Sequence, residues 1–163
     1  MSRDIKKATP YLQWFWNELK TAVKKELGLD IFIVDVDRDW KVQRAYYSQG
    51  RDSLEIVNKL RREAGLPAIR IEQNKKKITW TMNSKHIVNF DDNTEINNVS
   101  HAIDIGLKDS DGRYVGDSQA DINKDNERDY FQIGLIGERI GAGSIKWGGR
   151  FRNVDEPHYE ETK

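Results

Sequence analysis

The 163-residue chain has no cysteine and only three prolines, and its charges cancel, with 27 Lys and Arg against 27 Asp and Glu. Without cysteine there is no disulfide framework, no thiol nucleophile and no thiolate-ligated zinc, so any metal site must use His, Asp or Glu. A formal net charge of zero argues against a protein that mainly neutralises phosphates. We therefore expect no nucleic-acid partner.

The sequence also lacks long apolar segments. No run approaches the ~18 apolar residues that a membrane-spanning helix needs. The N-terminal segment has no uninterrupted apolar stretch of the kind found in secretory signals. We expect a protein made in the cytoplasm, with no stable membrane insertion. Its length and its 37% of hydrophobic residues fit one compact domain covering residues 1–163.

Hydrophobic periodicity and capping residues predict four helices. They cover residues 10–28, 39–49, 52–65 and 126–141. The first has the clearest start, with Thr9 as N-cap and Pro10 at the first helical position. The third is expected to begin at Asp52, because an acidic cap followed three residues later by Glu55 is typical of a capping box.

Short β-branched and apolar runs predict the strands. They cover residues 31–34, 69–71, 78–81, 102–105 and 145–147. The second and third are expected to pair as a hairpin around the basic turn at 73–77. Because helices and strands do not alternate as βαβ units, we expect an α+β fold with a small, mainly antiparallel sheet flanked by helices.

Three histidines concentrate the possible metal chemistry. His86, His101 and His158 each lie near a carboxylate or at the boundary of a predicted strand. Two imidazoles and one carboxylate make a typical catalytic zinc set, because they leave a coordination position for water. The same set also describes non-haem iron sites. Asp155 or Glu156, just before His158, could accept a proton from the water.

A family resemblance rests on these residues. The C-terminal part of the chain contains WGGRF at Trp147–Phe151 and DEPHYE at Asp155–Glu160. This pair of segments is similar to the WGG…DxPHFE signature of the M15 zinc peptidases. Ser84–His86 and Ala102–Asp104 resemble the two ends of that family's SxHxxGxAxD motif. Residues 38–51 resemble its GYR…Q…LYxQGR stretch. The family contains D-alanyl-D-alanine carboxypeptidases and dipeptidases and L-alanyl-D-glutamate endopeptidases, many of them bacteriophage endolysins.

The resemblance implies a hedgehog/D,D-peptidase-like fold with Zn²⁺ held by His86, Asp104 and His158. It also implies Asp155 as general base and Arg38 beside the scissile carbonyl. The implied enzyme is a metallopeptidase that hydrolyses an amide in the stem peptide of bacterial peptidoglycan, with the L-alanyl-D-glutamate bond as first choice. Its implied role is that of a monomeric endolysin of a bacteriophage, which waits in the host cytoplasm until it is released to the cell wall.

Two alternatives to this function stay open. Within the same class, the protein could be a D-alanyl-D-alanine carboxypeptidase or dipeptidase. From a different class, it could be a non-catalytic, zinc-containing module that binds the wall. Retention of Asp155 and Arg38 favours an enzyme over such a module.

Two departures from the family motif affect the metal ligands. The family places Asp seven residues after its first His, whereas eighteen residues separate His86 from Asp104. We therefore expect a polar loop, inserted at residues 89–98, between the two ligands. Ser100 stands where the motif has glycine, and His101 beside it is an alternative ligand to His86. Alternation along a strand would point His101 away from Asp104, which favours His86.

Two further motifs are interpreted as structural. Residues 109–112 resemble part of a calcium loop, but the twelve-residue frame would place Leu107 first and Ser118 last, so we expect a simple turn. The aromatic residues 14–16 could mark a carbohydrate or membrane surface. Their position on the apolar face of the first helix predicts instead that two of the three lie in the core.

Overall fold

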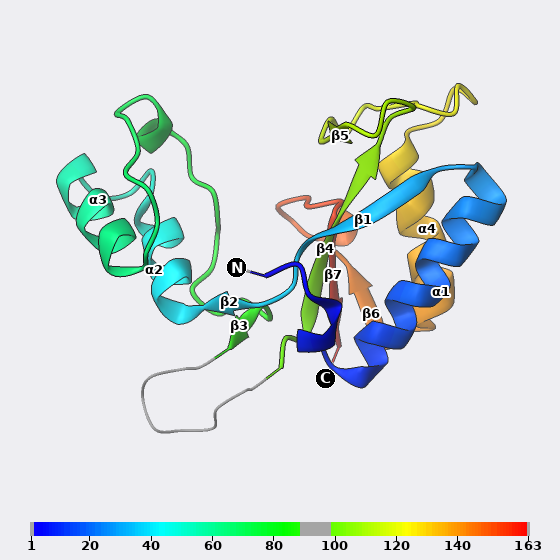
Figure 1. Cartoon of the computed structure of the whole chain (residues 1–163), viewed down its shortest axis with the longest axis horizontal. Coiled ribbons are helices and arrows are strands. Elements are labelled where there is room, and N and C mark those ends of the chain that lie inside the picture. Colours follow the sequence, from blue (N-terminus) through cyan, green and yellow to red (C-terminus); the bar gives the residue numbers. More distant parts are fainter. Residues whose placement is uncertain (1, 89–98, 163) are drawn as a thin grey trace.

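The computed structural model describes residues 2–88 and 99–162 (Figure 1). Within these residues the chain forms helices and a mainly antiparallel sheet, which confirms the predicted α+β class. The loop predicted at 89–98 lies outside the described residues. In the described part of the chain, no helix combines the length and the apolar character that a membrane crossing requires.

The helices agree closely with the periodicity of the sequence. The α-helices are α1 (Pro10–Leu27), α2 (Trp40–Ser48), α3 (Leu54–Glu63) and α4 (Asp129–Gly141), and the 3₁₀ helices are η1 (Ile5–Lys7), η2 (Gln73–Lys75) and η3 (Gly148–Arg150). Thr9 caps α1 as predicted, accepting a hydrogen bond from the backbone nitrogen of Leu12. The predicted cap of α3 is wrong: the capping side chain belongs to Ser53 rather than Asp52, because the helix begins one residue later.

The strands form one large sheet and one small one. They are β1 (Asp30–Asp35), β2 (Arg38–Asp39), β3 (Ile87–Val88), β4 (Ala102–Lys108), β5 (Tyr114–Val115), β6 (Ile145–Trp147) and β7 (His158–Glu161). The large sheet has the order β1-β4-β7-β6, with β5 added to β4, and all its pairs are antiparallel. β2 and β3 form a separate parallel pair.

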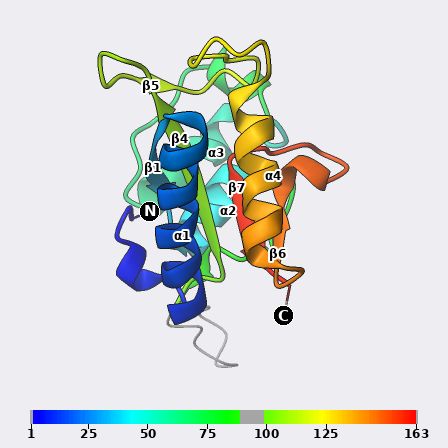
Figure 2. The ribbon, with the colours of Figure 1, turned by 90° about the vertical axis from the view of Figure 1, so that its right-hand side faces the viewer.

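Helices α1 and α4 pack side by side on one face of the large sheet (Figures 1 and 2). The core lies between them and the sheet, and it contains Phe15 and Trp16 but not Trp14, as predicted. Gly134 of α4 is needed for this packing, because a Cβ there would lie 2.1 Å from the ring of Trp147. The other face of the sheet carries Phe32, Val34 and Tyr114 around Gly106, as well as polar side chains.

A second group of elements, here called the helical lobe, comprises α2, α3 and residues 64–83. In Figure 1 it lies on the opposite side of the large sheet from α1 and α4. The parallel pair of β2 and β3 lies where the lobe meets the sheet, since β2 leads directly into α2 and β3 follows the end of the lobe. This pair therefore sets the position of the lobe beside the sheet.

The hairpin predicted at residues 69–81 is wrong. The segment 66–84, all of it described, contains the short helix η2 and no strand. Ile71 and Ile78 are exposed, so the β-branched residues that suggested strands have no apolar surface to pack against. Such residues favour strands only where a pleated surface covers them.

Amide side chains at the end of α2 and in α3 bond the backbone of this segment instead. Gln49 donates from Nε2 to the carbonyl of Gln73 at 2.9 Å. Asn58 accepts from the backbone nitrogen of Ile69 at 2.8 Å and donates to its carbonyl at 3.1 Å. Since side chains satisfy these backbone groups, the segment needs no partner strand.

Candidate metal centre

Strand register brings the first two predicted ligands together. Asp104 of β4 lies directly opposite His158 of β7. Directly paired residues of antiparallel strands point to the same face of a sheet with their Cβ atoms about 4.5–5.5 Å apart. Accordingly, Nδ1 of His158 lies 2.9 Å from Oδ1 of Asp104. The two side chains occupy the face of the sheet that α1 and α4 do not cover.

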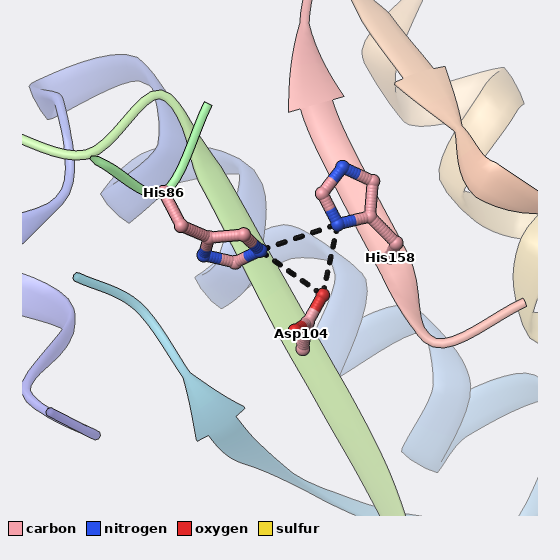
Figure 3. Close-up of side chains that lie close together, drawn as sticks. All are labelled: His86, Asp104 and His158. Atoms are coloured by element: carbon pink, nitrogen blue, oxygen red, sulfur yellow. Dashed lines mark hydrogen bonds and ion pairs between the residues drawn. The ribbon is translucent and has the colours of Figure 1, made fainter. Parts of the chain in front are cut away.

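His86 reaches the same point from the junction with the helical lobe. It immediately precedes β3, and its carbonyl accepts a hydrogen bond from the backbone nitrogen of Arg38 at 2.8 Å. Its Nε2 lies 3.2 Å from Oδ1 of Asp104 and 3.2 Å from Nδ1 of His158 (Figure 3). The three residues implied as ligands by the family resemblance thus form one cluster that could hold a metal ion.

The outer hydrogen bonds of both histidines direct lone pairs into the cluster. A carbonyl oxygen only accepts, so His86 donates from Nδ1 to the carbonyl of Val36, 2.7 Å away, and a neutral ring then has a bare Nε2. His158 donates from Nε2 to the carboxylate of Glu160 at 3.1 Å, which leaves Nδ1 bare. Two imidazole lone pairs and one carboxylate oxygen therefore converge, and a cation is the species that such a donor set accommodates.

The electrostatics of the cluster also favour a bound cation. Burial lowers the pKa of His158, but hydrogen bonds to Asp104 and Glu160 and the charges of nearby carboxylates outweigh this effect and raise it to about 9. Burial raises the pKa of Asp104, whereas His86 and His158 together hold it well below its usual range. The cluster is thus built around one added positive charge, which a proton or a metal ion can supply.

Arg38 is held beside the cluster by two side chains. Its Nη2 donates to Oδ2 of Asp35 at 2.7 Å, and its Nη1 donates to Oε1 of Gln43 at 2.7 Å. Asp35 is buried and pairs with Asp104 across β1 and β4, next to a bulge in β1. Burial raises the pKa of Asp35, and the guanidinium of Arg38 opposes that rise.

A cleft of about 650 Å³ opens over the cluster. It is lined by all three clustered residues and by Arg38 and Asp155. The side chain of Asp155 is exposed to the solvent in the cleft. Nevertheless, the protein atoms packed around it raise the pKa of its carboxyl by desolvation, and the charge of Asp104 raises it further, while His158 opposes the rise.

Gly148 of the Trp147–Phe151 segment allows the chain to approach the Asp155 loop closely. A Cβ on Gly148 would lie 2.2 Å from the carbonyl oxygen of Asp155 and 2.9 Å from Cβ of His158. The indole of Trp147 is buried and donates to the carbonyl of Glu156 at 2.7 Å. The motif therefore shapes the loop before β7, and Trp147 itself belongs to the core.

The structure does not bring the two rival residues to the cluster. Glu156 is buried, accepts a hydrogen bond from Nη1 of Arg128 at 3.1 Å and does not line the cleft. His101 lies 2.5 Å, through Nδ1, from a carboxylate oxygen of Glu161. Arg128 thus pairs with Glu156, and Glu161 pairs with His101, so neither rival residue is bonded to Asp104.

Sequence reasoning missed the residues that orient the predicted ones. Glu160 fixes the ring of His158, and Asp35 fixes Arg38. A signal for Glu160 existed, because it stands two residues after His158 and residues two apart on a strand share a face. The strand was not predicted there, since the short sequence HYEE carries little apolar pattern.

The chain is similar in structure to the L-Ala D-Glu endopeptidase ChiX of Serratia marcescens. The TM-score is 0.52 at 14% sequence identity, and the likeness covers 97% of this chain and 83% of ChiX. No protein-family model matches the sequence, and no curated protein matches it. The likeness confirms the predicted α+β, D,D-peptidase-like fold.

Proposed function

We propose that this protein is a zinc-dependent peptidoglycan hydrolase of the M15 type that cleaves the L-alanyl-D-glutamate bond of the stem peptide. The observation that carries the proposal is the convergence of His86, Asp104 and His158 in one cleft with Arg38 and Asp155. The fold shared with an L-Ala D-Glu endopeptidase supports it. We further propose that residues 1–163 act as one monomeric catalytic domain, used by a bacteriophage to lyse its host.

The donor set suits zinc. His86 and His158 offer imidazole nitrogens and Asp104 a carboxylate oxygen, which are the ligand types of catalytic zinc sites. When bound, zinc supplies a Lewis acid and makes a water molecule nucleophilic at neutral pH. Hydrolysis of an amide transfers no electrons, so it favours a redox-inert metal over iron, which also uses such ligands.

Asp155 and Arg38 are assigned the acid–base and electrostatic roles. A water oxygen forms a bond to the amide carbon, and Asp155 takes the proton that the water loses. Arg38 stabilises the negative charge that develops on the carbonyl oxygen. When the carbon–nitrogen bond breaks, the proton passes from Asp155 to the leaving amine. The raised pKa of Asp155 suits a group that both accepts and returns a proton.

The decisive experiment is a digest of purified peptidoglycan, analysed by mass spectrometry, with and without added zinc. New N-terminal D-glutamate residues would support the proposal, whereas released D-alanine or its dimer would indicate a carboxypeptidase or dipeptidase. If a chelator left the loss of wall turbidity unchanged, the zinc-dependent mechanism would be wrong. Binding to the wall without any cleavage would indicate a wall-binding module.

The roles of Asp155 and Arg38 are separable from metal binding. Replacing Arg38 with Ala should reduce turnover about 10²–10³-fold, the usual cost of losing a donor to a developing oxyanion. Asp155→Asn should lower turnover at least as far, because the amide cannot accept the proton. Zinc content, measured by mass spectrometry of the bound metal, should stay at one ion per chain in both variants. Loss of zinc would show that these residues act through the metal site.

A further inference from the structure

The loop leading into α4 has the residue spacing of a calcium-binding loop. Residues 121–132 are DINKDNERDYFQ. In the twelve-residue EF-hand frame, oxygen ligands come from positions 1, 3, 5, 7, 9 and 12. The side chains at positions 1, 3 and 5 are Asp121, Asn123 and Asp125, and position 9 is Asp129, the first residue of α4.

The loop winds around its first carboxylate. Asp121 accepts hydrogen bonds from the backbone nitrogens of Asp125 and Asn126, both at 3.1 Å. Asn126 has a φ of 70° at position 6, where EF-hands place glycine for the sharp turn. Asn adopts this left-handed conformation more readily than most residues. This geometry alone does not make a cation site, because such turns also occur without an ion.

Two buried oxygens in the loop have no hydrogen-bond donor in the described part of the chain. Asp129 has no exposed surface, and its Oδ2 accepts from the backbone nitrogen of Ile122 at 2.7 Å, but its Oδ1 has no partner. Gln132, at position 12, donates from Nε2 to Asp125 at 2.8 Å, while its Oε1 is buried without a partner. Burying an unsatisfied polar atom costs about 1–3 kcal/mol.

The unpaired oxygen of Asp129 belongs to the same electrostatic region as the other loop carboxylates. Burial raises the pKa of Asp129, and the charges of Asp121 and Asp125 raise it further. Asp129 thus lies within the electrostatic reach of two further loop carboxylates. The side chain of Gln132 joins them through its hydrogen bond to Asp125. A divalent cation bound by the loop would relieve this repulsion and offer a partner to the buried Oδ1 of Asp129.

We propose that residues 121–132 bind a calcium ion, at a site separate from the His86, Asp104 and His158 cluster. The donors are oxygens only, which suits a hard cation and not zinc. Calcium tolerates irregular coordination by a loop of this length, whereas magnesium demands a small octahedral site. Gln132 can offer one oxygen where EF-hands use a bidentate Glu, so we expect a dissociation constant of about 10⁻⁴–10⁻³ M.

The proposed calcium loop contacts the segment next to Asp155. Arg128, at position 8, binds the carboxylate of Glu156 at 3.1 Å, and Glu156 adjoins Asp155. An ion that holds the loop in one conformation would therefore also hold Arg128 against this segment. The proposal itself rests on the loop and does not depend on the peptidase function.

The test is calorimetric titration of the full chain with CaCl₂ at constant ionic strength. We expect one calcium per chain, a rise in Tm of about 3–8 °C at 10 mM CaCl₂, and at least tenfold weaker binding of MgCl₂. Asp121→Asn should weaken calcium binding about tenfold or more, because position 1 is a ligand. Asp111→Asn, which removes the same charge from the neighbouring 109–113 turn, should leave binding unchanged.

A gain-of-function variant completes the test. Gln132→Glu introduces the bidentate carboxylate that EF-hands have at position 12, and it should tighten calcium binding about tenfold. It also decides the question if Asp121→Asn does not fold. Absence of calcium binding by both the wild type and Gln132→Glu at 10 mM would overturn the proposal, as would equal binding by the wild type and Asp121→Asn. Loss of calcium binding in Asp104→Asn would place the ion in the histidine cluster and would also overturn it.

Discussion

The large sheet with α1 and α4 is held together differently from the helical lobe. The large sheet, α1 and α4 are here called the sheet half. In it, a continuous set of apolar side chains from α1, α4 and four strands is buried. Among the described residues, no lobe side chain belongs to that core. Besides Val42, Ala45 and Val57, the lobe buries three polar side chains whose hydrogen bonds hold its segments together: Gln43, Gln49 and Arg61. One half is stabilised mainly by a large apolar core, and the other combines a few apolar contacts with buried polar ones.

The contrast matters because the candidate metal centre spans the boundary between the two regions. Asp104 and His158 sit on paired strands of the sheet half. His86 and Arg38 come from the segments that flank the lobe. Loosening the lobe should therefore displace His86 and Arg38, while the register of β4 and β7 keeps the other two ligands together.

The largest effect is expected from the ligand on the lobe side. His86→Ala removes one of three donors, so bound zinc should be lost and hydrolysis of peptidoglycan should fall to the background rate. His101→Ala is the matched control, because His101 pairs with Glu161 instead. Metal content by mass spectrometry checks both. Zinc retained in His86→Ala but lost in His101→Ala would reverse the assignment.

The next effect concerns the apolar half. Leu19 is fully buried in α1, so Leu19→Ala should lower the free energy of unfolding by about 2–5 kcal/mol through lost burial and a cavity. Urea denaturation followed by circular dichroism measures the change. Leu27→Ala, at the partly exposed end of the same helix, is the control and should cost much less. A small loss for Leu19→Ala would contradict a sheet half stabilised by its core.

A smaller and more local effect is expected in the lobe. Gln49→Ala removes the donor to Gln73 and the acceptor of Nη1 of Arg61, whose Nε still donates to Pro67. We expect a cost of about 1–3 kcal/mol. Hydrogen exchange should speed up at residues 73–81, while the amides of α1 keep their protection. Faster exchange throughout α1 would show that the two halves unfold as one unit, and the comparison would then fail.

The smallest effect tests the outer partner of His158. Glu160→Gln keeps an acceptor near Nε2 but removes its charge, so zinc affinity should fall about tenfold. Glu161 is the adjacent residue on β7 and pairs with His101, so Glu161→Gln should leave the zinc affinity unchanged. Competition with a chromogenic chelator measures both. Equal affinities in the two variants would mean that Glu160 does not orient the ligand.

Local sequence patterns were enough for the helices and for the choice of chemical groups. Thr9, Pro10 and the apolar spacing after them specify α1, because helix caps and periodicity involve residues within a few positions of one another. The hairpin at 69–81 failed for the converse reason. Its β-branched residues favour a strand, but in the described part of the chain no other strand lies beside them to pair with. The amides of Gln49 and Asn58 bond the backbone instead.

By itself, then, the sequence determined the helices, the fold class and the side chains able to bind a metal. Only the tertiary structure decided that Asp104 faces His158, that His86 joins them across the β2–β3 pair, and that Glu160 and Val36 fix the rings. These are contacts between strands whose register depends on the whole sheet. A register shift of one residue would turn Asp104 into the core, and no short stretch of sequence contains that information.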